Sequence, residues 1–131
     1  MGLTWWLRAV GGLYLLIAIL SIGPRIPIKA EGPPGVLSRA AAGDPLARFV
    51  LDTWTMFGLY IGAFGISLLV ASPYPTSASA LAWAAIALEL IGGIGIDVYK
   101  LTRGYKFAAP LVWIAIHTAV IVTGLIVLGK L

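Results

Sequence analysis

The residues of this chain that could do chemistry are few, and three of them lie inside apolar segments. Glu89 and Asp97 are the carboxylates of the stretch ELIGGIGIDVYK, which ends a long apolar segment at Lys100. His117 is the only histidine and lies in the next apolar segment. Carboxylates and an imidazole can exchange protons, form hydrogen bonds or bind a metal. In an apolar helix such groups are costly, so each of them needs a compensating partner.

If the segment that holds Glu89 is a helix, its polar and small residues fall on one face. Spacings of three and four place side chains on the same side of a helix. Residues at these spacings are Ala78, Ala82, Ala85, Glu89, Gly92, Gly93, Ile96, Asp97 and Lys100. Small residues allow close helix packing in lipid. We therefore expect this face to point into a helix bundle, with Glu89 at mid-depth and Asp97 about two turns nearer the cytoplasm.

The position of His117 suggests a partner for Glu89. If the last two helices are antiparallel neighbours, His117 lies at nearly the depth of Glu89, with Trp113 one turn before it on the same side. A Glu89–His117 hydrogen bond would compensate both groups and couple their protonation. Two interpretations of Glu89 stay open, namely a structural hydrogen bond and a role in proton handling or recognition of a buried ligand. For Asp97 the pattern favours a structural ion pair with Lys100, Arg103 or Arg48.

A second group of candidates lies in the segment that follows Asp44-Pro45. Arg48 and Asp52 are one turn apart there, so a simple ion pair is one interpretation. The other is an acidic pair of Asp52 with Asp97, bridged by Arg48 or Arg103. The hydroxyl of Tyr99 could reach the same interior. The candidate ligand-binding or proton-handling residues are thus Glu89, His117, Asp97 and Asp52, supported by Arg48, Arg103, Tyr99 and Trp113.

These side chains must be positioned by helices in a membrane. The chain has 131 residues, is 60% hydrophobic and only 11% charged, and has a mean hydropathy of +1.01. Helices are predicted at about 4–22, 45–71, 79–101 and 108–130, each close to the roughly 20 residues that cross a bilayer. Lipid requires backbone groups to be satisfied within each segment, and the short connections favour antiparallel neighbours. We therefore predict an all-α membrane protein, one integral domain over 1–131, folded as an up-down bundle of four transmembrane helices.

The distribution of lysine and arginine predicts the orientation. Loop 23–44 with the start of the second helix, and the loop between the third and fourth helices, hold seven basic residues: Arg25, Lys29, Arg39, Arg48, Lys100, Arg103 and Lys106. The opposite side holds Arg8 and Lys130. Basic loops stay in the cytoplasm, so we expect both termini outside the cytoplasm in the inner (plasma) membrane. Within loop 23–44, residues 36–42 fit either a short interfacial helix or an extended loop.

Several classes of function are disfavoured by composition. The chain has no cysteine, which excludes disulfides and cysteine-ligated metals. Its basic residues form no stripe with interleaved aromatics, so we expect no nucleic-acid partner. Glu89, Asp97 and His117 lack the local spacing of a metal site. We predict no cofactor, with haem bound through His117 as an alternative.

Four passages resemble one family of small membrane proteins. They are WWLRAVGGLYLL, RAAAGDPLARFVLDTW, ELIGGIGIDVYKLTRGY and WIAIHTAVIVTG. Together they are similar to the BphX-like proteins. The resemblance implies a four-helix bacterial membrane protein and a connection with the handling of apolar aromatic compounds, since the family takes its name from a gene cluster for biphenyl degradation. It implies no catalytic residues.

Three functions fit these observations. The first is a non-enzymatic binding, transport-accessory or complex-subunit protein with a polar site for a small apolar ligand. The second is a membrane enzyme, such as an isomerase that uses Glu89, Asp52 or Asp97 for proton transfer. The third is a redox subunit that holds haem or quinone near His117. The lipid bilayer is the expected partner, together with a small apolar ligand, a larger membrane complex or further copies of the chain.

Overall fold

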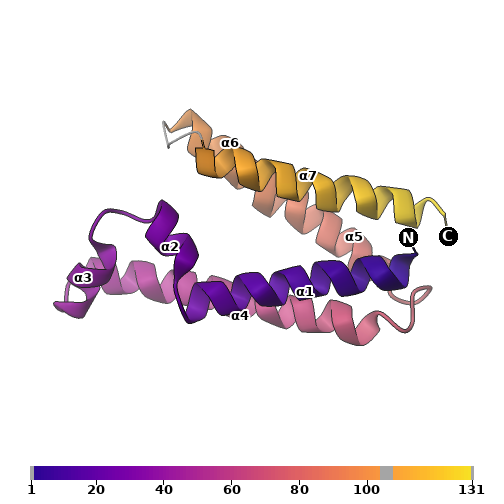
Figure 1. The fold of residues 1–131 in the computed structure, drawn as a ribbon, viewed down its shortest axis with the longest axis horizontal. Coiled ribbons are helices and arrows are strands. Elements are labelled where there is room, and N and C mark those ends of the chain that lie inside the picture. The colour runs from indigo at the N-terminus through magenta and orange to yellow at the C-terminus, as the bar shows by residue number, and fades with distance from the viewer. Residues whose placement is uncertain (1, 104–107, 131) are drawn as a thin grey trace. The chain divides into compact units, whose positions relative to one another are not determined.

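The computed structural model describes residues 2–103 and 108–130. All secondary-structure elements of these residues are helices (Figure 1). Four helices are long and apolar enough to cross a membrane: Leu3–Ile22, Pro45–Ala71, Ser79–Thr102 and Leu111–Leu128. The predicted all-α class with four apolar spans is therefore confirmed. The chain divides into two compact units, one formed by Met1–Val10 with Leu68–Leu131 and the other by Gly11–Ser67. The up-down order of all four helices stays a prediction.

In the unit Gly11–Ser67, helices α1 (Leu3–Ile22) and α4 (Pro45–Ala71) run antiparallel through a seam of glycines. A Cβ on Gly65 would lie 2.8 Å from the carbonyl oxygen of Gly11, and a Cβ on Gly58 would lie 3.1 Å from Cβ of Ser21. Contacts this close require glycine, so the seam lets the two backbones approach.

The connection between α1 and α4 is more helical than the sequence suggested. It contains α2 (Ile26–Glu31) and α3 (Val36–Ala41), so the short helix expected near residue 36 is present. Helix α2 forms despite Pro27, because a proline in the first turn removes no helical hydrogen bond. Both short helices pack on the start of α4 through a buried cluster of Ile28, Val36, Ala40 and Ala47.

The start of α4 follows the predicted capping pattern. Oδ1 of Asp44 accepts hydrogen bonds from the backbone N–H groups of Leu46 and Ala47, at 2.9 and 3.1 Å. These groups have no partner inside the helix, so the side chain of Asp44 satisfies them. Pro45 occupies the first helical position, where its missing N–H costs nothing.

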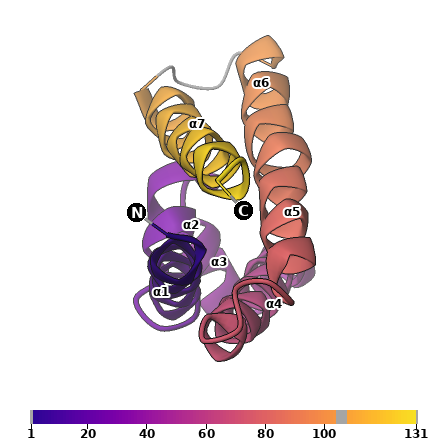
Figure 2. The ribbon, with the colours of Figure 1, turned by 90° about the vertical axis from the view of Figure 1, so that its right-hand side faces the viewer.

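The other unit holds an antiparallel helix pair (Figure 2). One member is a continuous helix made of α5 (Ser79–Leu88), a π-helical turn η1 (Glu89–Ile94) and α6 (Gly95–Thr102). The other is α7 (Ala108–Leu128). A Cβ on Gly124 would lie 2.9 Å from Cδ1 of Ile86, and one on Gly93 would lie 2.5 Å from Nδ1 of His117. Residue numbers thus increase along one helix where they decrease along the other, which makes the two helices antiparallel.

The first turns of α1 complete this unit. Nε1 of Trp6 donates a hydrogen bond to Oγ1 of Thr123 in α7 at 3.0 Å. Nε of Arg8 donates to Oγ of Ser72 at 3.2 Å, just after α4 ends. Trp6 is only 1% exposed, so its indole fills the space between α1 and α7 while its N–H keeps a partner.

Candidate functional site

A π-helical turn places the carboxylates of Glu89 and Asp97 on the same side of the third apolar helix, Ser79–Thr102. Eight α-helical steps of about 100° would leave Asp97 about 80° away from the direction of Glu89. Glu89–Ile94 instead forms a π-turn, which winds fewer degrees per residue. The wider turn removes much of that offset, so Glu89 and Asp97 both face α7. Such turns occur mostly as single insertions in α-helices and frequently at functional sites.

His117 of α7 lies between these two carboxylates. Nδ1 of its imidazole forms a hydrogen bond with Oε2 of Glu89. Its Nε2 lies 3.5 Å from Oδ2 of Asp97. Only a doubly protonated imidazole can donate a proton from both nitrogens. Oδ2 of Asp97 forms no hydrogen bond at that separation, so its contact with Nε2 is an ion pair only when the imidazole is protonated.

Lys100 extends the group toward the end of α6. Its Nζ lies 3.3 Å from Oδ1 of Asp97, one helical turn away. Asp97 thus has His117 at one carboxylate oxygen and Lys100 at the other. Two carboxylates, an ammonium and a protonated imidazole would together form a neutral group. A neutral cluster is far less costly in an apolar interior than an isolated charge.

The four side chains differ in their access to the surroundings. Glu89 and Asp97 are 5% and 3% exposed as whole residues. The side chains of His117 and Lys100 are 18% and 22% exposed. The carboxylates are therefore enclosed, and any molecule or proton that reaches the cluster from outside meets His117 or Lys100 first.

Two further residues fix the position of the imidazole. The ring of Trp113 stacks on that of His117 with centroids 6.1 Å apart and planes inclined by 27°. On the opposing helix Gly93 leaves the space that the ring fills, because a Cβ there would lie 2.6 Å from Cγ of His117. Trp113 and Gly93 together leave the imidazole little freedom to turn away from the carboxylates.

Comparison with known proteins identifies the family. The BphX-like family model matches residues 1–130, nearly the whole chain. The chain belongs to the BphX-like family. No curated protein and no solved structure matches it.

Not every candidate of this BphX-like chain joins the cluster. Arg103 and Tyr99 are exposed and interact with each other instead. Nε of Arg103 donates to the Tyr99 hydroxyl at 3.1 Å, and the guanidinium lies 5.3 Å from the centre of the Tyr99 ring. Of the partners considered for Asp97, Lys100 lies beside it, whereas pairing with Arg48 of the other unit stays a prediction.

Asp52 and Arg48 belong to the other compact unit of the BphX-like chain. Both are exposed on α4. Nε of Arg48 donates to the carbonyl oxygen of Ala40 at 3.2 Å, which ties α4 to the end of α3. Among the described residues the structure shows no Arg48–Asp52 ion pair. The alternative pairing of Asp52 with Asp97 joins residues of different units and stays a prediction.

The sequence also offered a cofactor alternative, haem on His117. Within residues 2–103 and 108–130 no three His, Cys, Asp or Glu side chains form a group that could hold a metal ion. Both nitrogens of His117 face carboxylates, so an iron ligand at this position would have to give up one of them. Haem on His117 therefore stays a prediction.

Sequence reasoning missed two features of the BphX-like site. The first is the π-turn, for which the adjacent Gly92 and Gly93 inside a helix are the available signal. The second is the contact of Asp97 with His117, which depends on that turn. Lys100 was considered only as a structural partner of Asp97.

Proposed function

We propose that this BphX-like chain is a non-enzymatic integral membrane protein that holds an exchangeable proton on Glu89, His117 and Asp97. In this proposal the proton takes part in the binding or passage of a small lipid-soluble molecule. The observation that carries it is His117, whose two nitrogens each face a buried carboxylate. Four apolar spans and family membership support a membrane setting.

The partial exposure of His117 supports one way in which such a site would work. A molecule in the lipid would meet the edge of the imidazole and the neighbouring Trp113, both only half-buried, while the carboxylates stay covered. A hydrogen bond donated by the imidazole to that molecule would change how its proton is shared with Glu89 and Asp97. Lys100 would connect the cluster to the end of α6.

An isomerase would need two carboxylates that face a common space open to substrate. The structure has a groove between the start of α5 and the end of α7, and no carboxylate is among its described lining residues. Glu89 and Asp97 face His117 instead. We therefore prefer binding to catalysis.

Two measurements on the protein in lipid nanodiscs test the proposal. ¹⁵N NMR of labelled histidine reads the protonation of His117 directly, because the chain has no other histidine. We expect the signal of each ring nitrogen in the native chain to report the carboxylate that it faces, and Glu89→Gln and Asp97→Asn to change the signals of Nδ1 and Nε2 respectively. Asp52→Asn, exposed on α4, is the matched control and should leave the signal unchanged.

The second measurement concerns the lipid-soluble molecule. A diazirine-bearing octanol, activated by light and located by peptide mass spectrometry, should label the peptide that holds Trp113 and His117. Glu89→Gln and His117→Gln should reduce this labelling, whereas Asp52→Asn should not. Ring-nitrogen signals that stay the same in both carboxylate variants, or labelling equal in all variants, would overturn the proposal.

A further inference from the structure

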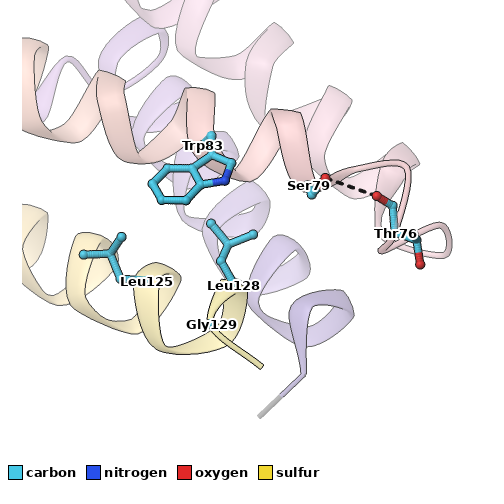
Figure 3. A pocket seen from close by; sticks show the side chains of 6 residues that line it. All are labelled: Thr76, Ser79, Trp83, Leu125, Leu128 and Gly129. Atoms are coloured by element: carbon cyan, nitrogen blue, oxygen red, sulfur yellow. Dashed lines mark hydrogen bonds between the residues drawn. The ribbon is translucent and has the colours of Figure 1, made fainter. Parts of the chain in front are cut away.

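A groove lies at the opposite end of the α5–α7 pair from Lys100 (Figure 3). It has a volume of about 460 Å³. Its lining residues are Thr76, Ser79, Trp83, Leu125, Leu128 and Gly129. Along the helix, Ser79 and Glu89 are separated by about 15 Å, so this groove is distinct from the carboxylate–imidazole cluster.

The groove has one apolar wall and one polar end. Leu125 and Leu128 of α7 face Trp83 of α5, and Trp83 is 54% exposed. The polar end is the turn before α5, where Oγ of Ser79 donates to the carbonyl oxygen of Thr76 at 3.1 Å (Figure 3). Trp83 is only one turn inside the helix, the depth at which tryptophan prefers the boundary between headgroups and acyl chains.

The charges at this end of the unit are positive. Lys130 directly follows Gly129 of the lining and is exposed. Arg8 is held at the same end by its hydrogen bond to Ser72, four residues before Thr76. Among the described residues of this unit, Glu89 and Asp97 are the only carboxylates, and both lie deeper along the third span. The electrostatic complement of the groove mouth is therefore an anion.

We propose that this groove binds an anionic phospholipid of the surrounding bilayer. One acyl chain lies against Trp83, Leu125 and Leu128. The phosphate lies at the mouth, near Lys130 and the hydroxyls of Thr76 and Ser79. The apolar wall, the hydrogen-bonding turn and the cationic rim lie in this order along the groove. A phospholipid has its acyl chain, ester region and headgroup in the same order. This site does not depend on the function proposed for His117.

Lipid retention tests the proposal. The full chain is reconstituted in vesicles with equal amounts of phosphatidylglycerol and phosphatidylcholine, extracted in mild detergent and examined by native mass spectrometry. We expect bound phosphatidylglycerol to exceed bound phosphatidylcholine. Lys130→Gln should lower that preference roughly fivefold, the effect of one lysine near an anionic surface. Trp83→Ala should lower retention of both lipids.

Matched controls separate the groove from general effects of charge and hydrophobicity. Lys29→Gln removes an exposed lysine from the other unit, and Val122→Ala removes an exposed apolar side chain of α7 outside the groove. Neither should change retention. Equal retention of the two lipids by the native chain, or the same loss in Lys29→Gln as in Lys130→Gln, would overturn the proposal. Lys130 is exposed, so we expect Lys130→Gln to fold. This variant tests the proposal even if Trp83→Ala fails to fold.

Discussion

The imidazole of His117 occupies the space that a side chain at Gly93 would fill. A Cβ on Gly93 would lie 2.5, 2.6 and 2.8 Å from three atoms of the ring. A backbone without a Cβ is thus what allows α7 to bring His117 between Glu89 and Asp97. The neighbouring Gly92 has no such role, since a Cβ there would meet only Cδ1 of Leu88 at an ordinary 3.4 Å.

Gly93→Ala should therefore displace His117, and Gly92→Ala should not. Overpacking of a well-packed site costs about 1–3 kcal/mol, whereas alanine at an open helical position stabilises by up to about 1 kcal/mol. Thermal unfolding followed by circular dichroism in detergent compares the two. We expect a lower midpoint for Gly93→Ala and an unchanged or higher one for Gly92→Ala. Equal midpoints would show that the ring does not depend on this space.

The mutual compensation of the buried charges gives a second prediction. Removing one partner of a buried ion pair leaves the other without compensation, at a cost of about 3–5 kcal/mol. We expect Glu89→Gln to approach this loss in the free energy of unfolding, measured by titration with a denaturing detergent. Asp52→Asn, on an exposed position of α4, should stay within about 0.5 kcal/mol of the native chain.

A triple variant sharpens this prediction. Replacing Glu89, His117 and Asp97 together by leucine, phenylalanine and leucine removes every charge that needs a partner except Lys100. Such replacements of buried charge networks are often neutral or stabilising. The triple variant should be more stable than Glu89→Gln and should have no exchangeable proton at the site. A triple variant less stable than the single one would mean that the charges themselves hold the two helices together.

Part of this structure could be predicted from the sequence. Hydropathy alone indicates four apolar helices, because a bilayer permits few alternatives. The Glu89–His117 contact could be inferred from the depth of the two residues in antiparallel helices. The choice of Lys100 as partner of Asp97 follows helical geometry, since the two residues are three apart in one helix.

The other features of the site and the fold depend on local backbone geometry, which a projection of the sequence on a regular helix does not contain. In a regular α-helix Asp97 would lie on the same broad face as Glu89 but about 80° around the helix from it, so a contact of both carboxylates with one imidazole was not inferred. Helix α2 was not predicted, because the four prolines in the first half of loop 23–44 argue against a continuous helix, although Pro27 falls in the first turn of α2. The pairing of Asp52 with Asp97 rests on depth alone and stays a prediction, because the two residues belong to different units.

The packing of α7 gives a third prediction, at Gly124. A Cβ there would lie 2.7 Å from Cζ2 of Trp6 and 2.9 Å from Cδ1 of Ile86. Gly124→Ala should thus push α1 and α5 away from α7 and cost about 1–3 kcal/mol. Gly12→Ala is the control in α1, because nothing lies within 4 Å of its Cβ position. In the same thermal unfolding measurement we expect a lower midpoint for Gly124→Ala only.

The orientation in the membrane gives the last prediction, and the absence of cysteine makes it easy to test. Ser38 and Ser77 are exposed and lie before and after α4, whose 27 residues are long and apolar enough to cross a bilayer. The basic residues around Ser38 favour the cytoplasm for that loop. In intact cells a maleimide that cannot cross membranes should therefore label Ser77→Cys and leave Ser38→Cys unlabelled until the cells are permeabilised. The reverse labelling would place both termini in the cytoplasm, and Lys100 would then connect the His117 cluster to the outside rather than to the cell interior.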